Sequence, residues 1–303
     1  MIEQPNILII GKNSFIGNSY EENTEFKNLD KISLRDSTLE ELSFRNYQAL
    51  LHLPAIVHQS SKIPYEKYHE INTTLAYETA QKAKEEGIKH FIFFSTIRIY
   101  GEYTQNIETW DEATTPHPTD NYGKSKLEAE KKIAALSDDH FAVSILRIPM
   151  VYGPGNRGNI NKMIHFIEKF RFSPFSRINN ERNVLYIKNL VDFLDKIIQH
   201  RTGGLFVVTD PNPVSTSEIA DDICKHIDKK ILKFSIPGIF RFLLKSIWRA
   251  GYYKIFGNLK LDCTKSFERV AFEPGYNFGE GIAEMMEWYK NNKKARSEAN
   301  NEQ

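Results

Sequence analysis

Short apolar runs alternate with longer segments of helical periodicity through the first half of the chain. The runs are rich in β-branched and aromatic residues, and the expected strands cover residues 6–10, 31–34, 49–53, 90–96 and 142–148. Amphipathic helices are expected at 72–86 and 121–136. Continuous apolar strands separated by such helices are typical of a parallel sheet that is covered on both faces. The pattern therefore predicts a Rossmann-like, doubly wound α/β domain.

The pattern loosens after Gly153, where turn residues fill the stretch YGPGNRGN. A helix is expected at about 160–170 and a strand at 205–209, and the remainder is helical or irregular. We therefore expect two domains. Residues 1–170, joined by about 183–210, form the α/β domain, and 211–303 with 171–182 form a smaller, mainly helical one. The last residues, 293–303, are polar and are expected to fray.

Composition narrows the classes of protein that remain. At 303 residues the chain can bury a core and a sizeable pocket. Its 40 basic residues nearly balance its 39 acidic ones, so nothing favours nucleic acid as a partner. Cys224 and Cys263 form neither a disulfide framework nor a metal-ligand spacing, and the amino-terminal segment resembles a strand more than a secretory signal. These features predict a cytoplasmic protein without a metal site.

The stretch GKNSFIG directly follows the first expected strand. Gly11 would let the chain turn sharply, and Gly17 would let the next helix pack closely on the strand. A dinucleotide turn of this kind usually has a third, middle glycine, and that position is Ser14 here. Serine reduces the clearance for a pyrophosphate but adds a hydroxyl donor. The stretch thus predicts an altered nucleotide turn, with a plain strand-to-helix turn as the alternative.

The residue that contacts the cofactor ribose is expected about 20 residues beyond this turn, where an acid selects NAD and an arginine accommodates the NADP phosphate. The second expected strand is followed by Arg35 and then Asp36. The pair is ambiguous and leans towards NADP. A surface salt bridge, or a helix cap by Asp36, is the alternative for either residue alone.

Tyr122 and Lys126 have the Y-x-x-x-K spacing that puts both side chains on one helix face. The spacing occurs again at Tyr289 and Lys293, so it is not decisive alone. Thr96, however, closes an expected strand, and residues just past strand carboxyl ends line the ligand crevice of a doubly wound sheet. A lysine cation and a positive nicotinamide ring could lower the tyrosine pKa by about three units, which requires roughly 4 kcal/mol. The three residues suit proton transfer coupled to hydride transfer.

Taken in order, these residues resemble the extended short-chain dehydrogenase/reductase family, in its nucleotide-sugar epimerase and dehydratase branch. The resemblance covers nearly the whole chain and includes LLHLPAI, STIRIYG, YGKSK, RIPMVYGPG and RNVLYIKNL. It implies an NAD(P)-binding first domain, a substrate-binding second domain and a homodimer. The expected catalytic residues are Thr96, Tyr122 and Lys126. The expected cofactor-binding residues are Gly11, Ser14, Phe15, Ile16, Gly17, Arg35, Asp36, Leu53, Pro54, Ala55, Asn72, Lys126 and Pro149. The expected substrate-binding residues are Thr96, Arg98, Met150 and Arg182, with Arg182 at a nucleotide diphosphate.

The chain departs from this family pattern at several positions. Dehydratases carry an Asp-Glu pair after the catalytic threonine, whereas Ile97 and Arg98 follow Thr96 here. Met150 replaces a common substrate-binding asparagine. The usual His and Asp of a later motif are Tyr186 and Asn189. Elimination chemistry therefore lacks its acid and base, and the identity of the sugar does not transfer from the family.

The resemblance implies hydride transfer at a sugar carbinol, expected at carbon 4, in the synthesis of sugars for surface polysaccharides. A 4-keto-sugar reductase using NADPH and a 4-epimerase retaining NAD would use the same residues. The short connection between Gly17 and the second expected strand, together with Arg35, favours the reductase. The name of the family branch favours the epimerase. A dinucleotide-sensing protein without catalysis is an alternative from another class, but it would be expected to lose Tyr122 or Lys126.

The run 236–256 is apolar, aromatic and basic. Arg241, Lys245 and Arg249 recur within it, so it is not expected to span or insert through a membrane. It could lie in a membrane interface, where a lipid-linked sugar would be the substrate of an epimerase. The favoured alternative is amphipathic packing within the substrate domain or a dimer contact.

Overall fold

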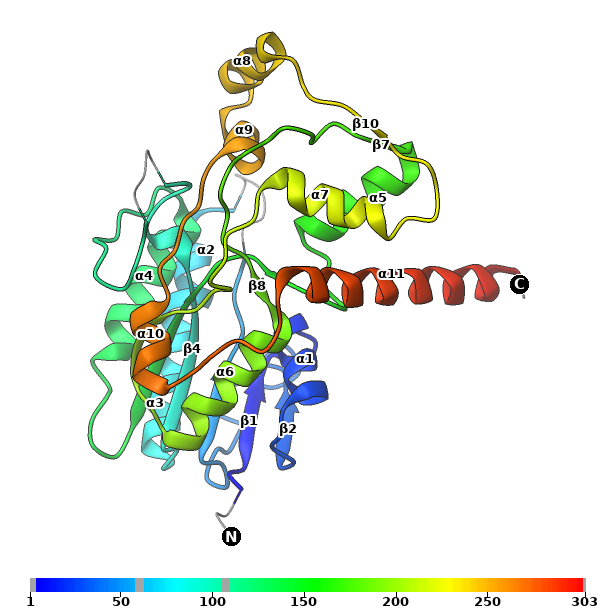
Figure 1. Cartoon of the computed structure of the whole chain (residues 1–303). Coiled ribbons are helices and arrows are strands. Elements are labelled where there is room, and N and C mark those ends of the chain that lie inside the picture. Colours follow the sequence, from blue (N-terminus) through cyan, green and yellow to red (C-terminus); the bar gives the residue numbers. More distant parts are fainter. Residues whose placement is uncertain (1–3, 58–62, 105–108, 302–303) are drawn as a thin grey trace.

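The computed structural model describes residues 4–57, 63–104 and 109–301. Its centre is a parallel sheet of six strands in the order β2-β1-β3-β4-β5-β9 (Figure 1). The strands are β1 (Ile7–Ile10), β2 (Leu29–Ile32), β3 (Ala49–His52), β4 (His90–Thr96), β5 (Ala142–Ile148) and β9 (Gly204–Val207). The strand order reverses between β1 and β3, as expected for a doubly wound sheet. The predicted fold class is confirmed.

Alternate residues of the strands pack into two separate hydrophobic cores, one on each face of the sheet. Ile7 and Ile9 of β1 pack on one face with helices α1 and α6, whereas Leu8 and Ile10 pack on the other with α3 and α4. Every residue of β1, β3 and β4 is buried, because helices cover both faces of the sheet. The covering helices are α1 (Phe15–Asn23), α3 (Leu75–Glu85), α4 (Asn121–Ala134) and α6 (Ile187–His200).

Two boundaries in this domain differ from the prediction. The second strand ends at Ile32 and not at Leu34, because the Ile32 carbonyl oxygen accepts the Gly11 and Lys12 amides and the chain then turns away. The helix expected at 72–86 begins at Tyr65, directly after Pro64. Its apolar periodicity is interrupted at a π-helical turn, where buried polar side chains face α4 instead of the sheet. The continuous helical segment thus consists of α2 (Tyr65–Tyr68), the π-helix η1 (His69–Thr74) and α3.

The carboxyl-terminal part is mainly helical, as predicted. Its helices are α5 (Asn159–Phe170), α7 (Thr216–Lys225), α8 (Gly238–Ile247), α9 (Arg249–Phe256), α10 (Thr264–Val270) and α11 (Phe278–Asn301). There are also two small parallel sheets: β6 (Val151–Tyr152) pairs with β8 (Leu185–Tyr186), and β7 (Phe172–Ser173) pairs with β10 (Leu232–Lys233). A one-turn 3-10 helix, η2 (Ile97–Ile99), follows β4. The division into two domains at the expected residues stays a prediction.

The expected fraying of 293–303 is wrong for 293–301, which continue α11, and 302–303 lie outside the described residues. The helix starts with Ile282, Met285 and Met286 in the core, which supplies the nucleus that a polar helical tail lacks by itself. The Lys293 ammonium then lies 2.5 Å from a carboxylate oxygen of Glu168 in α5.

A buried ion pair fastens α4 to the sheet. Arg147 of β5 places Nη2 2.7 Å from Glu130 Oε2 and donates through Nε to the same carboxylate, and both side chains are almost fully buried. The Ser95 hydroxyl of β4 donates to Glu130 as well. Arg147 Nη1 donates to the Tyr100 hydroxyl at 2.7 Å. The charges and hydrogen-bonding groups of this cluster are thus paired with one another across one helix and two strands.

We predict that Glu130→Ala lowers the free energy of unfolding by roughly 3 to 5 kcal/mol, because it leaves the Arg147 charge buried without its partner. Chemical denaturation of the variant and of wild type measures the difference. Glu85→Ala, on the exposed face of α3, is the matched control and should change stability by no more than about 0.5 kcal/mol. Equal, small effects of the two substitutions would show that the ion pair is not needed to hold α4.

Candidate active site

A pocket of about 510 Å³ opens at the carboxyl ends of β1, β3, β4 and β5. This is the edge at which a doubly wound sheet binds its ligands. Twelve of the predicted site residues line it: Ser14, Phe15, Ile16, Leu53, Ala55, Thr96, Arg98, Tyr122, Lys126, Pro149, Met150 and Arg182. Gly11, Gly17, Arg35, Asp36, Pro54 and Asn72 do not line it.

The glycine turn has the geometry of a nucleotide turn, with serine in a double role. Gly11 has φ +119°, and a Cβ there would stand 3.0 Å from Leu53 Cβ. Ser14 caps α1, since its Oγ accepts the Gly17 amide at 3.0 Å. A Cβ on Gly17 would lie only 2.7 Å from that Oγ. Both glycines are therefore needed by the backbone, and the serine hydroxyl hydrogen can still point into the pocket beside the helix N-terminus.

The three expected catalytic side chains converge in the pocket. Asp120 caps α4 by accepting the Gly123 amide at 2.7 Å, which fixes the start of the helix that carries Tyr122 and Lys126. The Tyr122 and Thr96 hydroxyls hydrogen-bond each other. Lys126 Nζ donates to the Phe94 carbonyl at 2.8 Å and lies 4.3 Å from the centre of the Phe93 ring. The helix thus presents a phenol and an amine to the end of β4.

Burial controls the protonation of both groups. It raises the pKa of Tyr122 to about 12, and the Asp120 carboxylate acts in the same direction. It lowers the pKa of Lys126 to about 7. The sequence predicts a lowered tyrosine pKa, and the protein's own groups produce the opposite shift, because desolvation of the phenolate outweighs the nearby cations. Tyr122 is therefore protonated at neutral pH and suited to donate a proton.

Asn72 lies beneath the pocket wall and does not line the pocket. Its Oδ1 accepts the Ile56 amide at 2.7 Å, and its Nδ2 donates to the Ile56 carbonyl and to Ser125 Oγ, both at 3.1 Å. The side chain is fully buried. It therefore ties the loop after β3 to the helix that carries Tyr122 and Lys126, and its expected contact with the cofactor stays a prediction.

Arg35 and Asp36 lie in an exposed turn beyond β2. The Asp36 amide donates to the Ser33 carbonyl at 3.2 Å, and the Arg35 amide donates to Ser33 Oγ at the same distance. Within residues 4–57, 63–104 and 109–301, no ion pair involves either side chain. The choice between NAD and NADP at this position stays a prediction.

The substrate side of the pocket contains two arginines with different surroundings. Arg98 is half-buried and is neutralised by Asp120 and Glu102. Arg182 donates Nη1 to the Gly257 carbonyl at 2.8 Å and to the Tyr253 carbonyl at 3.2 Å. No carboxylate pairs with it in the part of the chain that the structure describes, and burial lowers its pKa to about 10. A desolvated cation without a counter-ion beside a pocket fits the binding of an anion.

Several lining residues were missed in the sequence. Tyr253 and Lys254 of α9 and the amides Asn156, Asn159 and Asn183 also face the pocket. They come from loops, from the first residue of α5 and from α9, whose apolar and basic pattern predicted only a lid region. The second Y-x-x-x-K match, in contrast, lies in α11, where Tyr289 and Lys293 both contact Glu168. Among the described residues, no group of three or more His, Cys, Asp or Glu is arranged to hold a metal ion.

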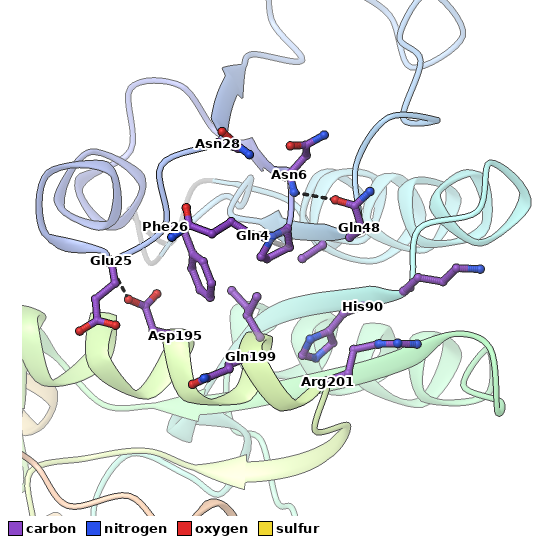
Figure 2. A pocket seen from close by; sticks show the side chains of 14 residues that line it. Gln4, Asn6, Glu25, Phe26, Asn28, Gln48, His90, Asp195, Gln199 and Arg201 are labelled. Carbon is purple, nitrogen blue, oxygen red and sulfur yellow. Dashed lines mark hydrogen bonds between the residues drawn. The ribbon is translucent and has the colours of Figure 1, made fainter. Parts of the chain in front are cut away.

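A second hollow lies at the opposite edge of the sheet. It is lined by segments that precede the strands and by the end of α6, as Figure 2 shows. Its polar groups bond one another: the Asn6 amide donates to Gln48 Oε1 at 2.6 Å, and the Glu25 amide donates to Asp195 Oδ2 at 3.0 Å. These contacts tie loops together at the amino ends of the strands, away from the edge that binds ligands in this architecture.

Comparison with known proteins identifies relatives along most of the chain. The model of the NAD dependent epimerase/dehydratase family matches residues 4–208. A UDP-glucose 4-epimerase of Vibrio cholerae is 30% identical over 260 residues, which cover 83% of this chain and 79% of that protein. The N-acetyl-alpha-D-glucosaminyl-diphospho-ditrans,octacis-undecaprenol 4-epimerase of Escherichia coli O157:H7 is 23% identical over 254 residues, covering 77% and 75%. The solved structure of MoeE5 in complex with UDP-glucose and NAD has the same fold, with a TM-score of 0.75, 19% identity and coverage of 95% and 99%.

We predict that Lys126→Met makes the free protein more stable, while it impairs cofactor binding. The pKa of Lys126 is lowered in the fold, so its charged form is penalised most below about pH 7, and the penalty declines as the pH rises towards the unfolded pKa. The gain in the free energy of unfolding, on the order of a few kcal/mol, should therefore be larger at about pH 6 than at about pH 9.

Denaturation curves at the two pH values, with Lys124→Met on the exposed face of the same helix as control, measure this gain. A gain that is absent, or that grows with pH, would contradict the assignment of a desolvated amine at this position.

Proposed function

The chain belongs to the NAD-dependent epimerase/dehydratase family, and from that premise we propose that it is a reductase that transfers hydride to carbon 4 of a 4-keto nucleotide sugar. Family membership also confirms the resemblance found in the sequence. The observation that carries the proposal is the convergence of Tyr122, Thr96 and Lys126 in one pocket at the carboxyl edge of the sheet, where desolvation raises the pKa of Tyr122 and keeps its hydroxyl protonated. A phenol in this state is a proton donor, and a reduction needs one.

The residues of the chain divide the work of this reduction. A bound nicotinamide dinucleotide supplies the hydride that arrives at the carbonyl carbon. Tyr122 donates its proton to the carbonyl oxygen, so that a secondary alcohol forms, and Thr96 hydrogen-bonds the same oxygen. Lys126 stabilises the resulting phenolate until the tyrosine takes up a proton from solvent, and the Phe94 carbonyl holds its amine near that position. Apolar residues at the start of α1 and in the loop after β3 line the pocket beside these groups.

Arg182 anchors the diphosphate of the substrate in this proposal, since it lines the pocket with a permanent charge that no carboxylate of the described residues pairs with. We propose NADPH as the cofactor, because Arg35 follows β2 on the exposed side where a 2′-phosphate would be accessible. A cytoplasmic homodimer that makes sugars for surface polysaccharides is the setting that the resemblance implies.

A 4-epimerase is the second candidate. The names of the two relatives favour it, and one of them acts on a sugar carried by a polyprenyl diphosphate. The same three catalytic residues would then also remove a proton, which requires a bound positive nicotinamide to lower the pKa of Tyr122. Dehydration is disfavoured, because Ile97 and Arg98 occupy the positions of its carboxylates and the Arg98 charge is already paired. A sensor without catalysis is disfavoured because Tyr122 and Lys126 both face the pocket.

We predict that the purified protein consumes NADPH, and NADH more slowly, when given 4-keto nucleotide sugars, and that Tyr122→Phe lowers turnover at least about 100-fold. Cofactor affinity should stay within about twofold of wild type, because the hydroxyl serves the substrate oxygen and not the dinucleotide. Absorbance of the reduced cofactor follows the reaction, and fluorescence titration gives the affinity.

Tyr289→Phe is the matched control, since it removes a hydroxyl from the other Y-x-x-x-K pair and should leave turnover unchanged. Interconversion of two nucleotide sugars without net cofactor consumption would replace the reductase with the epimerase. Full activity of Tyr122→Phe would overturn both proposals.

We predict that Arg182→Ala raises KM for the nucleotide sugar roughly 10- to 100-fold, the range for loss of charge-assisted hydrogen bonds, with little change in turnover at saturation. Arg182→Lys keeps the charge but loses the fork, and should fall between wild type and the alanine variant. Steady-state kinetics of the three proteins test this. A loss confined to turnover would assign Arg182 to the reacting centre instead of the diphosphate.

A further inference from the structure

Helix α8 presents large apolar side chains to solvent. Ile239, Leu243 and Ile247 form a stripe at helical spacing and are 71%, 44% and 83% exposed. Phe242 beside the stripe is 70% exposed, and Trp248 at the helix end is 56% exposed. No residue of α8 is buried, and Figure 1 shows the helix at one extremity of the molecule, with α9 between it and the sheet domain. The outward face of α8 therefore does not pack within the substrate domain, and the dimer contact, the other part of the alternative favoured in the sequence, stays a prediction. An exposed apolar patch of this kind marks an interaction surface.

The charged residues within the segment that forms this patch all have one sign. Residues 236–256 contain four basic residues and no acidic residue, although the whole chain has a net charge of only +1. Arg241 donates Nε to the Ile236 carbonyl at 2.9 Å and lies 5.2 Å from the Phe256 ring centre, so it faces the protein. Lys245 is exposed and, like Arg249, approaches the rings of α9. The result is an amphipathic helix with an outward apolar face and a basic flank.

This pattern distinguishes between two possible occupants of the surface. A symmetric contact between two copies through α8 would bring the same cations together, and like charges across an interface repel. An anionic bilayer complements both features, because its headgroups attract the lysine and arginine side chains and its acyl boundary accepts the apolar face. The helices of the described chain include none that is long and apolar enough to cross a bilayer, so the contact would stay at the surface.

We propose that α8 is an interfacial anchor that docks the protein on an anionic membrane surface. The helix lies parallel to the bilayer with Phe242, Ile247 and Trp248 in the headgroup region. Because α9 follows at once and contributes Tyr253 and Lys254 to the pocket wall, docking places the active-site mouth close to the membrane.

Vesicle binding by the full-length protein tests this anchor without reference to turnover. We expect the protein to co-sediment with vesicles that contain phosphatidylglycerol and to remain in solution with phosphatidylcholine alone. Ile247→Ser and Lys245→Glu should each weaken binding roughly tenfold or more, whereas Lys131→Glu, an exposed charge reversal on α4, should weaken it far less. Thermal unfolding checks that the variants fold. We expect them to fold, because the substituted side chains are exposed.

Trp248 supplies an internal probe of the contact. Its fluorescence should shift to shorter wavelength on anionic vesicles, and Trp248→Phe should remove the shift, since the other two tryptophans lie outside α8: Trp110 is buried, and Trp288 of α11 packs against the core. Absence of binding, or equal binding by wild type and Ile247→Ser, would overturn the anchor. Dimerisation that sedimentation detects and that Ile247→Ser abolishes would assign the patch to a second copy. A protein that binds vesicles but reduces no keto sugar would leave the anchor standing and refute only the proposed reaction.

Discussion

The buried pair between Glu130 and Arg147 is the interaction on which the active site depends. Tyr122, Lys126 and Glu130 follow one another at intervals of four residues on one face of α4, so the carboxylate that fastens the helix lies one turn beyond the amine. Arg147 and Ser95 hold that carboxylate from two neighbouring strands. The register of the helix against the sheet, and with it the position of the Tyr122 hydroxyl beside Thr96, therefore follows from a polar cluster and not from apolar packing alone.

The pocket contains two desolvated cations that the fold tolerates for different reasons. Burial lowers the pKa of the Lys126 amine to about 7, so that the amine loses its proton at a small cost in free energy near neutral pH. Arg182 keeps its charge near neutral pH and is held by the carbonyls at the end of α9. Among the residues that the structure describes, neither forms an ion pair with a carboxylate, whereas Arg98 and Arg147 do. Unpaired, desolvated cations such as these two fit sites that bind negatively charged or polar parts of ligands. They also lower the stability of the free protein.

The segment that closes the pocket also carries the most exposed apolar surface of the described chain. Helix α9 faces inward with Tyr253, whose ring stacks on Tyr103 at 3.7 Å, while α8 faces outward with none of its residues buried. One short stretch of sequence is thus divided between a ligand wall and an interaction surface. If α8 moved when it bound the membrane, α9 would move with it. The positions of Tyr253 and of its contact with Arg182 in the pocket wall would then change.

Local periodicity by itself determined the strands at His90–Thr96 and Ala142–Ile148, the catalytic helix and the glycine turn, because neighbouring residues encode burial and turn geometry. The ordered motifs likewise located Thr96, Tyr122 and Lys126 in one site. Only the tertiary structure decided the direction of the Tyr122 pKa shift, the buried hydrogen bonds of Asn72, the exposed place of Arg35 and the outward face of α8. Each of these depends on desolvation or on contacts between residues far apart in the chain. No local pattern records how much water a side chain retains after distant segments have packed around it.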